Sequence, residues 1–391
     1  MSRSPAEENG WSLGEQNPES LDEPHNAHHE IIIAQDSDRI IKVREYDRSH
    51  GSDSEEKDLQ MIGTASMHVS SKALEHIDYF KSMLRGSWRE SSQEIILEDD
   101  KITAVEVWMR LFHSTLDKLD MDSISIEDVW YLIITGDKYG LNFRKLSSWF
   151  AKWYGHQDST KTQNFERKML YPCYVFNYAR GFLAVSKHLV YNVAGHISEV
   201  NPTEITQLHI APRVLQQLNA ARGRLRNLIN RYLNEKVKCI VGSSSCECKE
   251  NTVFYYYREL RRIQIWPLEE ITAKTSVDRL LTRLKDFDEQ LMLRNMSKAK
   301  GPEKLCSECT HNWKRDVQEA IKKVSTYFDG LCLDCMVKIK DEIKIIRHSS
   351  DDEYYVFTHN RYDEGCRVDH GEPTQYFSVN GRRDKRGLIA D

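Results

Sequence analysis

The 391-residue sequence has no apolar run approaching the roughly 18–20 residues that a membrane-spanning helix needs. Its opening segment, MSRSPAEENGWSLGEQNPES, contains no apolar stretch of the kind found in secretory signals. The formal net charge is only −5, which does not favour general attraction to nucleic acid. We therefore expect an intracellular protein, in the nucleus or the cytoplasm, without membrane association.

The sequence also lacks the short motifs that mark common catalytic centres. It contains no G-x-S-x-G elbow, no glycine-rich phosphate loop, no H-E-x-x-H helix and no G-x-G-x-x-G turn. Individual histidines, aspartates and serines occur, as in any chain of this length. We therefore predict that the protein is not an enzyme, and we assign no catalytic residue.

The composition is that of a globular protein with a polar surface. Hydrophobic residues make up 40% and charged residues 29%, and the length favours two or three domains. Residues 1–29 are polar and acidic, and we expect them to form a disordered tail. The rest divides into residues 30–155, a helical region at 160–300, and a cysteine-rich helical region at 301–391 that ends in a basic tail.

Residues 30–155 combine strand-like and helix-like patterns. Apolar runs of strand length begin near Ile31 and recur at 61–69 and 94–97. Two capping patterns, Thr103-x-x-Glu106 and Ser125-x-x-Asp128, each precede apolar residues at helical spacing. Strands followed by several helices predict an α+β domain, with a mainly α-helical region behind it.

Several motifs in this part occur in the order found in one family. They are His68-Val-Ser-Ser-Lys-Ala-Leu74, Tyr79-Phe-Lys-Ser-Met-Leu84, Trp88-Arg-Glu90, the run Ile95 to Asp100, and the helix end Ile134 to Gly140. Together they resemble the centre of a BTB/POZ domain. The resemblance covers about residues 30–155.

The resemblance implies a non-catalytic protein-interaction module. A BTB-mediated scaffold or adaptor is the leading interpretation; a substrate receptor of a cullin-type ubiquitin ligase and a chromatin- or transcription-associated regulator are the alternatives. Self-association through this domain and cullin binding would both follow from the family. Aromatic anchors dominate such interfaces, so the expected partner-binding residues are Trp108, Phe112, Trp130 and Tyr139.

The C-terminal region carries a second resemblance. The segments Tyr327 to Cys335 and Cys366 to Ser378 resemble the C-terminal region of a group of fungal BTB-containing proteins. The resemblance implies a fungal source and this architecture, and it attaches no reaction.

Two C-x-x-C pairs predict a metal site. Each such turn lets two thiolates reach one tetrahedral ion at about 2.3 Å, and two turns complete four ligands. We therefore predict that a structural Zn²⁺ is bound by Cys306, Cys309, Cys332 and Cys335. The competing interpretation is four reduced and packed thiols.

The remaining cysteines offer a second candidate site, formed by Cys246, Cys248, Cys366 and His370. Packed or surface thiols are the alternative interpretation, and His370 or His311 could instead replace a ligand of the first site.

A basic run, with Arg222, Arg224, Arg226 and Arg231, raises the question of nucleic-acid binding. Interleaved leucines give the run the pattern of an amphipathic helix, so we predict a solvated basic face.

Overall fold

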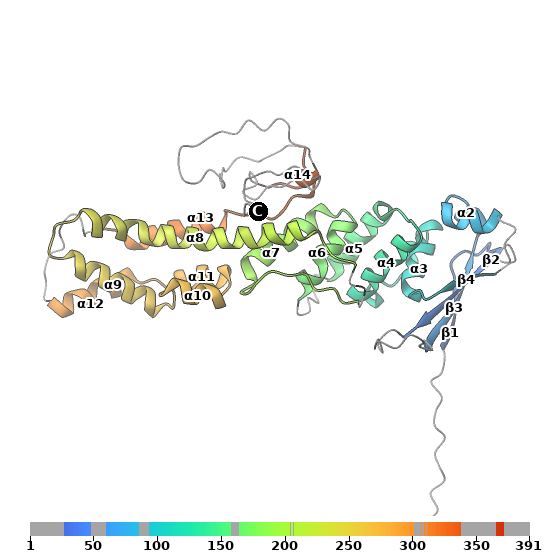
Figure 1. The fold of residues 1–391 in the computed structure, drawn as a ribbon, viewed down its shortest axis with the longest axis horizontal. Coiled ribbons are helices and arrows are strands. Elements are labelled where there is room, and N and C mark those ends of the chain that lie inside the picture. The colour runs from blue at the N-terminus through green and yellow to red at the C-terminus, as the bar shows by residue number, and fades with distance from the viewer. Residues whose placement is uncertain are drawn as a thin grey trace, which may run out of the picture.

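A computed structural model describes residues 27–47, 60–85, 94–157, 164–203, 205, 207–300, 306, 309, 311–337 and 365–370. Within these residues the chain is mixed α and β, with a small sheet followed by a long helical arm (Figure 1). This confirms the predicted α+β class and the helical C-terminal region. The Trp88–Glu90 motif, residues 1–26 and the basic tail lie outside the described residues.

Four strands form the sheet, in the order β1-β3-β2-β4. Their bounds are β1 (Ala27–Ile32), β2 (Arg39–Tyr46), β3 (Met61–Val69) and β4 (Glu94–Glu98). β2 pairs antiparallel with β3, whereas β1 pairs in parallel with β3 and β4 in parallel with β2. β1 therefore starts before the predicted Ile31. Residues 27–29, assigned from sequence to a disordered tail, pair with β3 because polar side chains are accommodated on the solvent face.

One face of the sheet is buried and apolar, and the other is exposed to solvent. The buried side is formed by Ile41, Val43, Ala65, Met67, Ile95 and Leu97, and α3 packs on it. On the other side Lys42 pairs with Glu94 and Arg44 pairs with Glu98 across neighbouring strands. The alternation along each strand therefore fixes which face receives the helices.

In the first half of the chain, α1 and α2 lie between β3 and β4, and the other helices and turns follow β4. Their bounds are α1 (Ser71–Leu74), α2 (Asp78–Arg85), α3 (Ile102–Phe112), η2 (Leu116–Lys118), η3 (Met121–Ser123), α4 (Ile126–Lys138), η4 (Phe143–Leu146) and α5 (Ser147–Gln157).

The two predicted capping boxes have different outcomes. α4 begins as predicted, with Ser125 and Asp128 bonding each other's backbone N–H groups. The prediction at Thr103 is wrong, because Lys101 and not Thr103 is the N-cap residue of α3, and the Ile102 N–H donates to the carboxylate of Glu45 on β2. A tertiary acceptor thus replaces the local cap.

The helical arm extends away from the sheet (Figure 1). Its helices are α6 (Phe165–Val175), α7 (Ala179–Asn192), α8 (Pro212–Ser243), α9 (Lys249–Arg262), α10 (Leu268–Lys274), α11 (Val277–Leu284), α12 (Glu289–Lys300), α13 (Trp313–Ser325) and α14 (Leu333–Val337). The 32 residues of α8 correspond to about 48 Å.

The described helices on either side of the predicted boundary near residue 300 pack together. α13 packs along α8 and also contacts α11, although 69 residues separate α8 from α13 along the chain (Figure 1). The rings of Tyr256 and Trp313 lie 4.3 Å apart between α9 and the start of α13. The described part of residues 301–391 therefore shares its core with residues 160–300.

Two helical glycines provide a matched test of the packing. A Cβ at Gly136 of α4 would lie 2.3 Å from Phe143 and 2.9 Å from Trp108, whereas a Cβ at Gly155 of α5 meets nothing within 4 Å. We expect Gly136→Ala to lower the free energy of unfolding by about 1–3 kcal/mol. Gly155→Ala should instead raise it by up to about 1 kcal/mol, through helix propensity. Urea denaturation followed by tryptophan fluorescence measures both, and equal effects would contradict the packing described.

Candidate metal centres

The eight predicted ligand residues converge in two groups of four, paired differently from the prediction. The cysteine cluster comprises Cys246, Cys248, Cys306 and Cys309, and the cysteine–histidine cluster comprises Cys332, Cys335, Cys366 and His370. In each cluster all four ligand atoms lie within 4.8 Å of one another.

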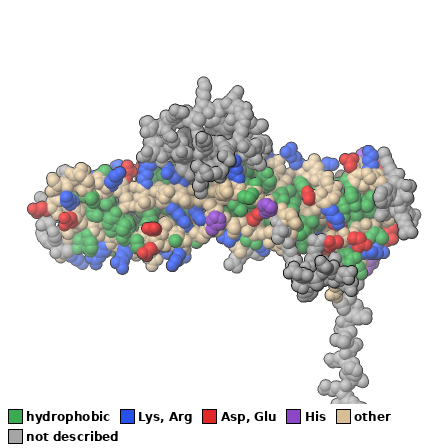
Figure 2. All heavy atoms as spheres, viewed as in Figure 1, with side chains coloured by type: hydrophobic (Ala, Val, Ile, Leu, Met, Phe, Trp, Pro, Cys, Tyr) green, Lys and Arg blue, Asp and Glu red, His purple; other side chains and the backbone are tan. Residues whose placement is uncertain are grey.

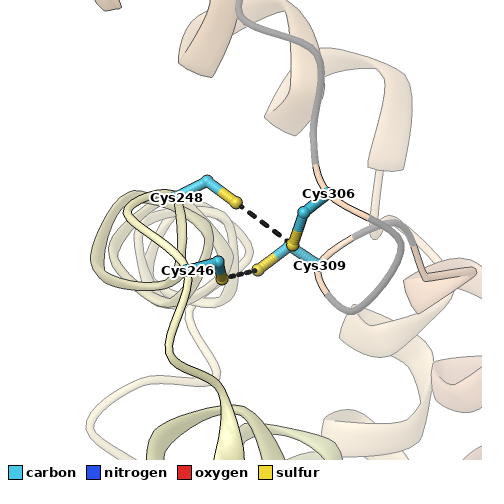
Figure 3. Close-up of side chains that lie close together, drawn as sticks. All are labelled: Cys246, Cys248, Cys306 and Cys309. Atoms are coloured by element: carbon cyan, nitrogen blue, oxygen red, sulfur yellow. Dashed lines mark hydrogen bonds between the residues drawn. The ribbon is translucent and has the colours of Figure 1, made fainter.

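The cysteine cluster joins the α8–α9 turn to the segment before α13 (Figure 3). The sulfur atoms of Cys246 and Cys309 are 3.4 Å apart, and those of Cys248 and Cys306 are 3.5 Å apart. Cys309 is fully buried, whereas the other three thiols are half-buried. The cluster therefore lies just below the surface at the far end of the arm.

Local backbone geometry presents these thiols. Cys248 is the N-cap residue of α9, so Cys246 and Cys248 occupy the short turn between two helices. On the other side the Cys309 N–H donates to the Cys306 carbonyl at 3.1 Å, which closes the C-x-x-C turn. Both pairs thus face the same point from separate turns.

Buried contacts beneath the cluster hold the two turns together. Tyr256 of α9 donates its hydroxyl to the Leu233 carbonyl of α8 and packs on Trp313. The backbone N–H of Trp313 donates to Glu289 at the start of α12. The cluster therefore lies where α8, α9, α12 and α13 meet.

The cysteine–histidine cluster brings α14 and the segment 365–370 together. The Cys335 sulfur lies 3.6 Å from the Cys366 sulfur and 3.5 Å from Nε2 of His370. Cys332, Cys335 and His370 are buried, and Cys366 is half-buried. Three of the four ligands are therefore shielded from solvent.

The chain that carries Cys332 is fastened to α7. The Tyr191 hydroxyl donates to the Val324 carbonyl and accepts from the Phe328 N–H, and the Ser186 hydroxyl accepts from the Leu331 N–H. Gly330 has φ +108°, and a Cβ there would lie 2.2 Å from the Leu183 carbonyl oxygen. Only glycine permits this close approach.

Arg367 anchors the other half of the cluster. Its guanidinium pairs with the Asp334 carboxylate of α14 and donates to the backbone carbonyl and side chain of Asn177. Its own N–H also donates to Asp334. Arg367 thus places Cys366 and His370 against both α14 and the α6–α7 turn.

The thiols of each cluster influence one another's protonation. A hydrogen bond from Cys335, and then one from His370, lowers the pKa of Cys332, while the pKa of Cys335 is raised by that same bond and by burial. At the other cluster, burial first and then Cys246 raise the pKa of Cys309. A bound cation would lower the pKa values of Cys335 and Cys309, because it stabilises the thiolates.

Both donor sets fit a tetrahedral metal ion. A four-thiolate site with bonds of about 2.3 Å has ligand atoms roughly 3.8 Å apart, close to the separations found here. Each set supplies four ligands from two turns, the number that closes a tetrahedral shell. The clusters could therefore each hold a metal ion.

The predicted grouping of Cys306 and Cys309 with Cys332 and Cys335 is corrected by this geometry. The α13 helix lies between the two pairs, so each pair instead meets a partner from elsewhere in the chain. The predicted second set is divided too: Cys246 and Cys248 belong to the cysteine cluster, whereas Cys366 and His370 belong to the cysteine–histidine cluster. His311 is no substitute ligand in this arrangement, since its Nε2 contacts Asp316.

The predicted partner-binding aromatics lie mostly in the core. Trp108 and Trp130 are completely buried and donate their indole N–H groups to backbone carbonyls, and Tyr139 is 6% exposed and bonded to Asp100. Phe112 alone is half-buried. Three of the four predicted partner-binding residues are therefore buried within the chain, where Trp108 contacts α4 and Trp130 contacts α6.

A recess between the sheet and α4 offers a further concave surface. Its acidic lining includes Glu45 and Asp100, but both carboxylates are engaged within the chain. Glu45 binds the Lys101 ammonium at 2.6 Å, and Asp100 binds Lys138 at 2.8 Å and the hydroxyl of Tyr139. These pairs join the sheet to α3 and α4.

Comparison of the chain with protein-family models, curated proteins and solved structures gave no match. Among the described residues, none of the helices combines the length and the apolar character required to cross a bilayer.

The pairing of the thiols can be tested by oxidation. We expect the oxidant diamide, applied to the native protein, to form Cys246–Cys309 and Cys248–Cys306 disulfides first, because these sulfur atoms already lie 3.4 and 3.5 Å apart. Peptide mapping by mass spectrometry identifies the links. A link from either Cys306 or Cys309 to Cys332 or Cys335 as the main product would contradict the two clusters.

Proposed function

We propose that the protein is a non-catalytic protein-interaction scaffold whose helical arm is held by two structural zinc ions. The observation that carries the proposal is the presence of two complete four-ligand sets, each drawn from segments far apart in the chain. One ion would occupy the cysteine cluster and the other the cysteine–histidine cluster.

Ligand chemistry supports zinc as the metal. Cys₄ and Cys₃His are the usual donor sets of structural zinc sites, and soft thiolates disfavour magnesium and calcium. Four protein ligands leave no position for a metal-bound water, so neither site is suited to hydrolysis. The zinc ions would stabilise the arm without taking part in a reaction.

The interaction role rests on the N-terminal region. The sheet with its covering helices is compatible with the BTB-like fold that the sequence motifs imply. Two large aliphatic side chains, Ile32 and Ile96, are exposed on the solvent face of this sheet, and Ile62 is exposed at the recess beside α4. Exposed aliphatics of this kind are better suited to a protein partner than the buried aromatics.

Charge distribution favours a protein partner over nucleic acid. Basic and acidic side chains are interspersed along the described part of the helical arm in the face drawn in Figure 2. The net charge of −5 also favours a protein partner over nucleic acid. A cullin-type ligase receptor is a special case of the proposed scaffold, and recovery of a cullin with the protein would identify it.

Metal content gives the direct test. Protein purified without a metal-binding tag should contain about two zinc ions per chain by elemental analysis. Cys309→Ser and Cys335→Ser should each lower the content to about one ion, and the double variant should bind almost none. Each loss should also lower the melting temperature of the arm, because the ions tie distant segments together.

The matched control is Cys239→Ser, which removes an exposed thiol of α8 that belongs to neither cluster. It should keep the full zinc content and melting temperature. Wild-type protein with less than about a tenth of a zinc ion per chain under reducing conditions would refute the metal proposal.

Partner binding gives the second test. We expect Ile32→Asp to reduce recovery of protein partners by the tagged full-length chain, since Ile32 is 65% exposed on the sheet. Val241→Asp is the control, because Val241 is 63% exposed at the distal end of α8. Affinity purification with quantitative mass spectrometry compares the two. Equal recovery with both variants and the wild type would argue against a partner surface on the sheet.

A further inference from the structure

One arginine of the basic run is not on a solvated face. Arg222 of α8 is only 7% exposed, so the sequence-based prediction is wrong at this position. Its Nη2 donates to the side-chain oxygen of Asn219 at 3.1 Å, whereas Nε and Nη1 are buried and make no hydrogen bond. A buried guanidinium with two unsatisfied donors is costly to the fold.

Neighbouring charges do not compensate this cation. Arg226, one turn along α8, donates to the carbonyls of Ala194 and Thr275, and its Nε is also buried without a hydrogen bond. Burial, followed by the charges of Arg226 and Arg167, lowers the pKa of Arg222 to about 10. Arg222 therefore stays charged at neutral pH beside two further cations.

The surrounding backbone holds the group in place. Asn219, the acceptor for Arg222, also accepts from the Ile197 N–H and donates to the Ile197 carbonyl. The segment between α7 and α8 is thereby fastened over this part of α8. Arg222 and Arg226 therefore lie beneath the segment between α7 and α8, and not on the open side of the helix.

We propose that Arg222 and Arg226 bind a tetrahedral oxyanion of the phosphate or sulfate type. The free donors are Nε and Nη1 of Arg222 and Nε of Arg226, and they belong to two side chains on successive turns of the helix. A tetrahedral anion directs four oxygens in different directions, so it can accept hydrogen bonds from more than one guanidinium. It also supplies the negative charge that the described residues around Arg222 lack.

The anion has a structural consequence independent of the zinc sites. It would neutralise the buried charge between α8 and the loop after α7, so its binding should stabilise the folded protein. The proposal concerns α8 before the cysteine cluster, and it stands whether or not the clusters bind zinc.

Thermal unfolding and calorimetry with inorganic phosphate test the proposal. At constant ionic strength set with chloride, phosphate and sulfate should each raise the melting temperature of the wild type by several degrees, with about one anion bound per chain. Arg222→Met should abolish this rise. In phosphate-free buffer Arg222→Met should melt no lower than the wild type, because the substitution removes an uncompensated buried charge.

Two further variants keep the test decisive. Lys238→Met removes the same formal charge from an exposed position on α8 and should keep the full phosphate response. Arg226→Gln retains more polar character at a half-buried position and should weaken phosphate binding by at least about tenfold. No binding to the wild type up to about 10 mM phosphate, or an unchanged affinity in Arg226→Gln, would overturn the proposal.

Discussion

The helical arm depends on closing long stretches of chain onto themselves. Within the cysteine cluster, the paired sulfurs belong to residues 58 and 63 positions apart, and within the cysteine–histidine cluster to residues 31 positions apart. Closing a loop of about 60 residues costs roughly 3–4 kcal/mol in chain entropy. Structural zinc binding, at roughly 10–16 kcal/mol, exceeds that cost several-fold. A bound metal ion would therefore hold the start of α9 next to the start of α13 and so close the chain from α9 to α12 into a loop.

Hydrogen bonds to backbone groups supply the remaining precision. Tyr191 and Ser186 satisfy one carbonyl at the end of α13 and two N–H groups between α13 and α14, and Arg367 donates to the Asn177 carbonyl. These are groups that a short irregular segment would otherwise bury without partners. The same principle explains the start of α3, where Glu45 accepts the Ile102 N–H. Irregular backbone is thus ordered by side chains from the regular elements next to it.

The sequence carried the local features and missed those set by tertiary contacts. The Ser125–Asp128 capping box was predictable because both partners lie within one turn, whereas the cap of α3 comes from a residue 57 positions away. The C-x-x-C pairs were recognisable as ligands, but their partners depend on how α8 returns through α9 to α13. Arg222 had the spacing of a solvated residue, and only the loop packed over α8 places it inside.

The length of α8 also sets a spacing. Its 32 residues set its two ends about 48 Å apart; the cysteine cluster follows the end at Ser243, and the sheet lies beyond the other end (Figure 1). The span is a single helix, and α13 packs along it, so it resists bending more than a flexible linker of the same length would. Two molecules bound at opposite ends would meet only if each projected about 24 Å toward the other. α8 therefore holds the segments at its two ends at a set distance from each other.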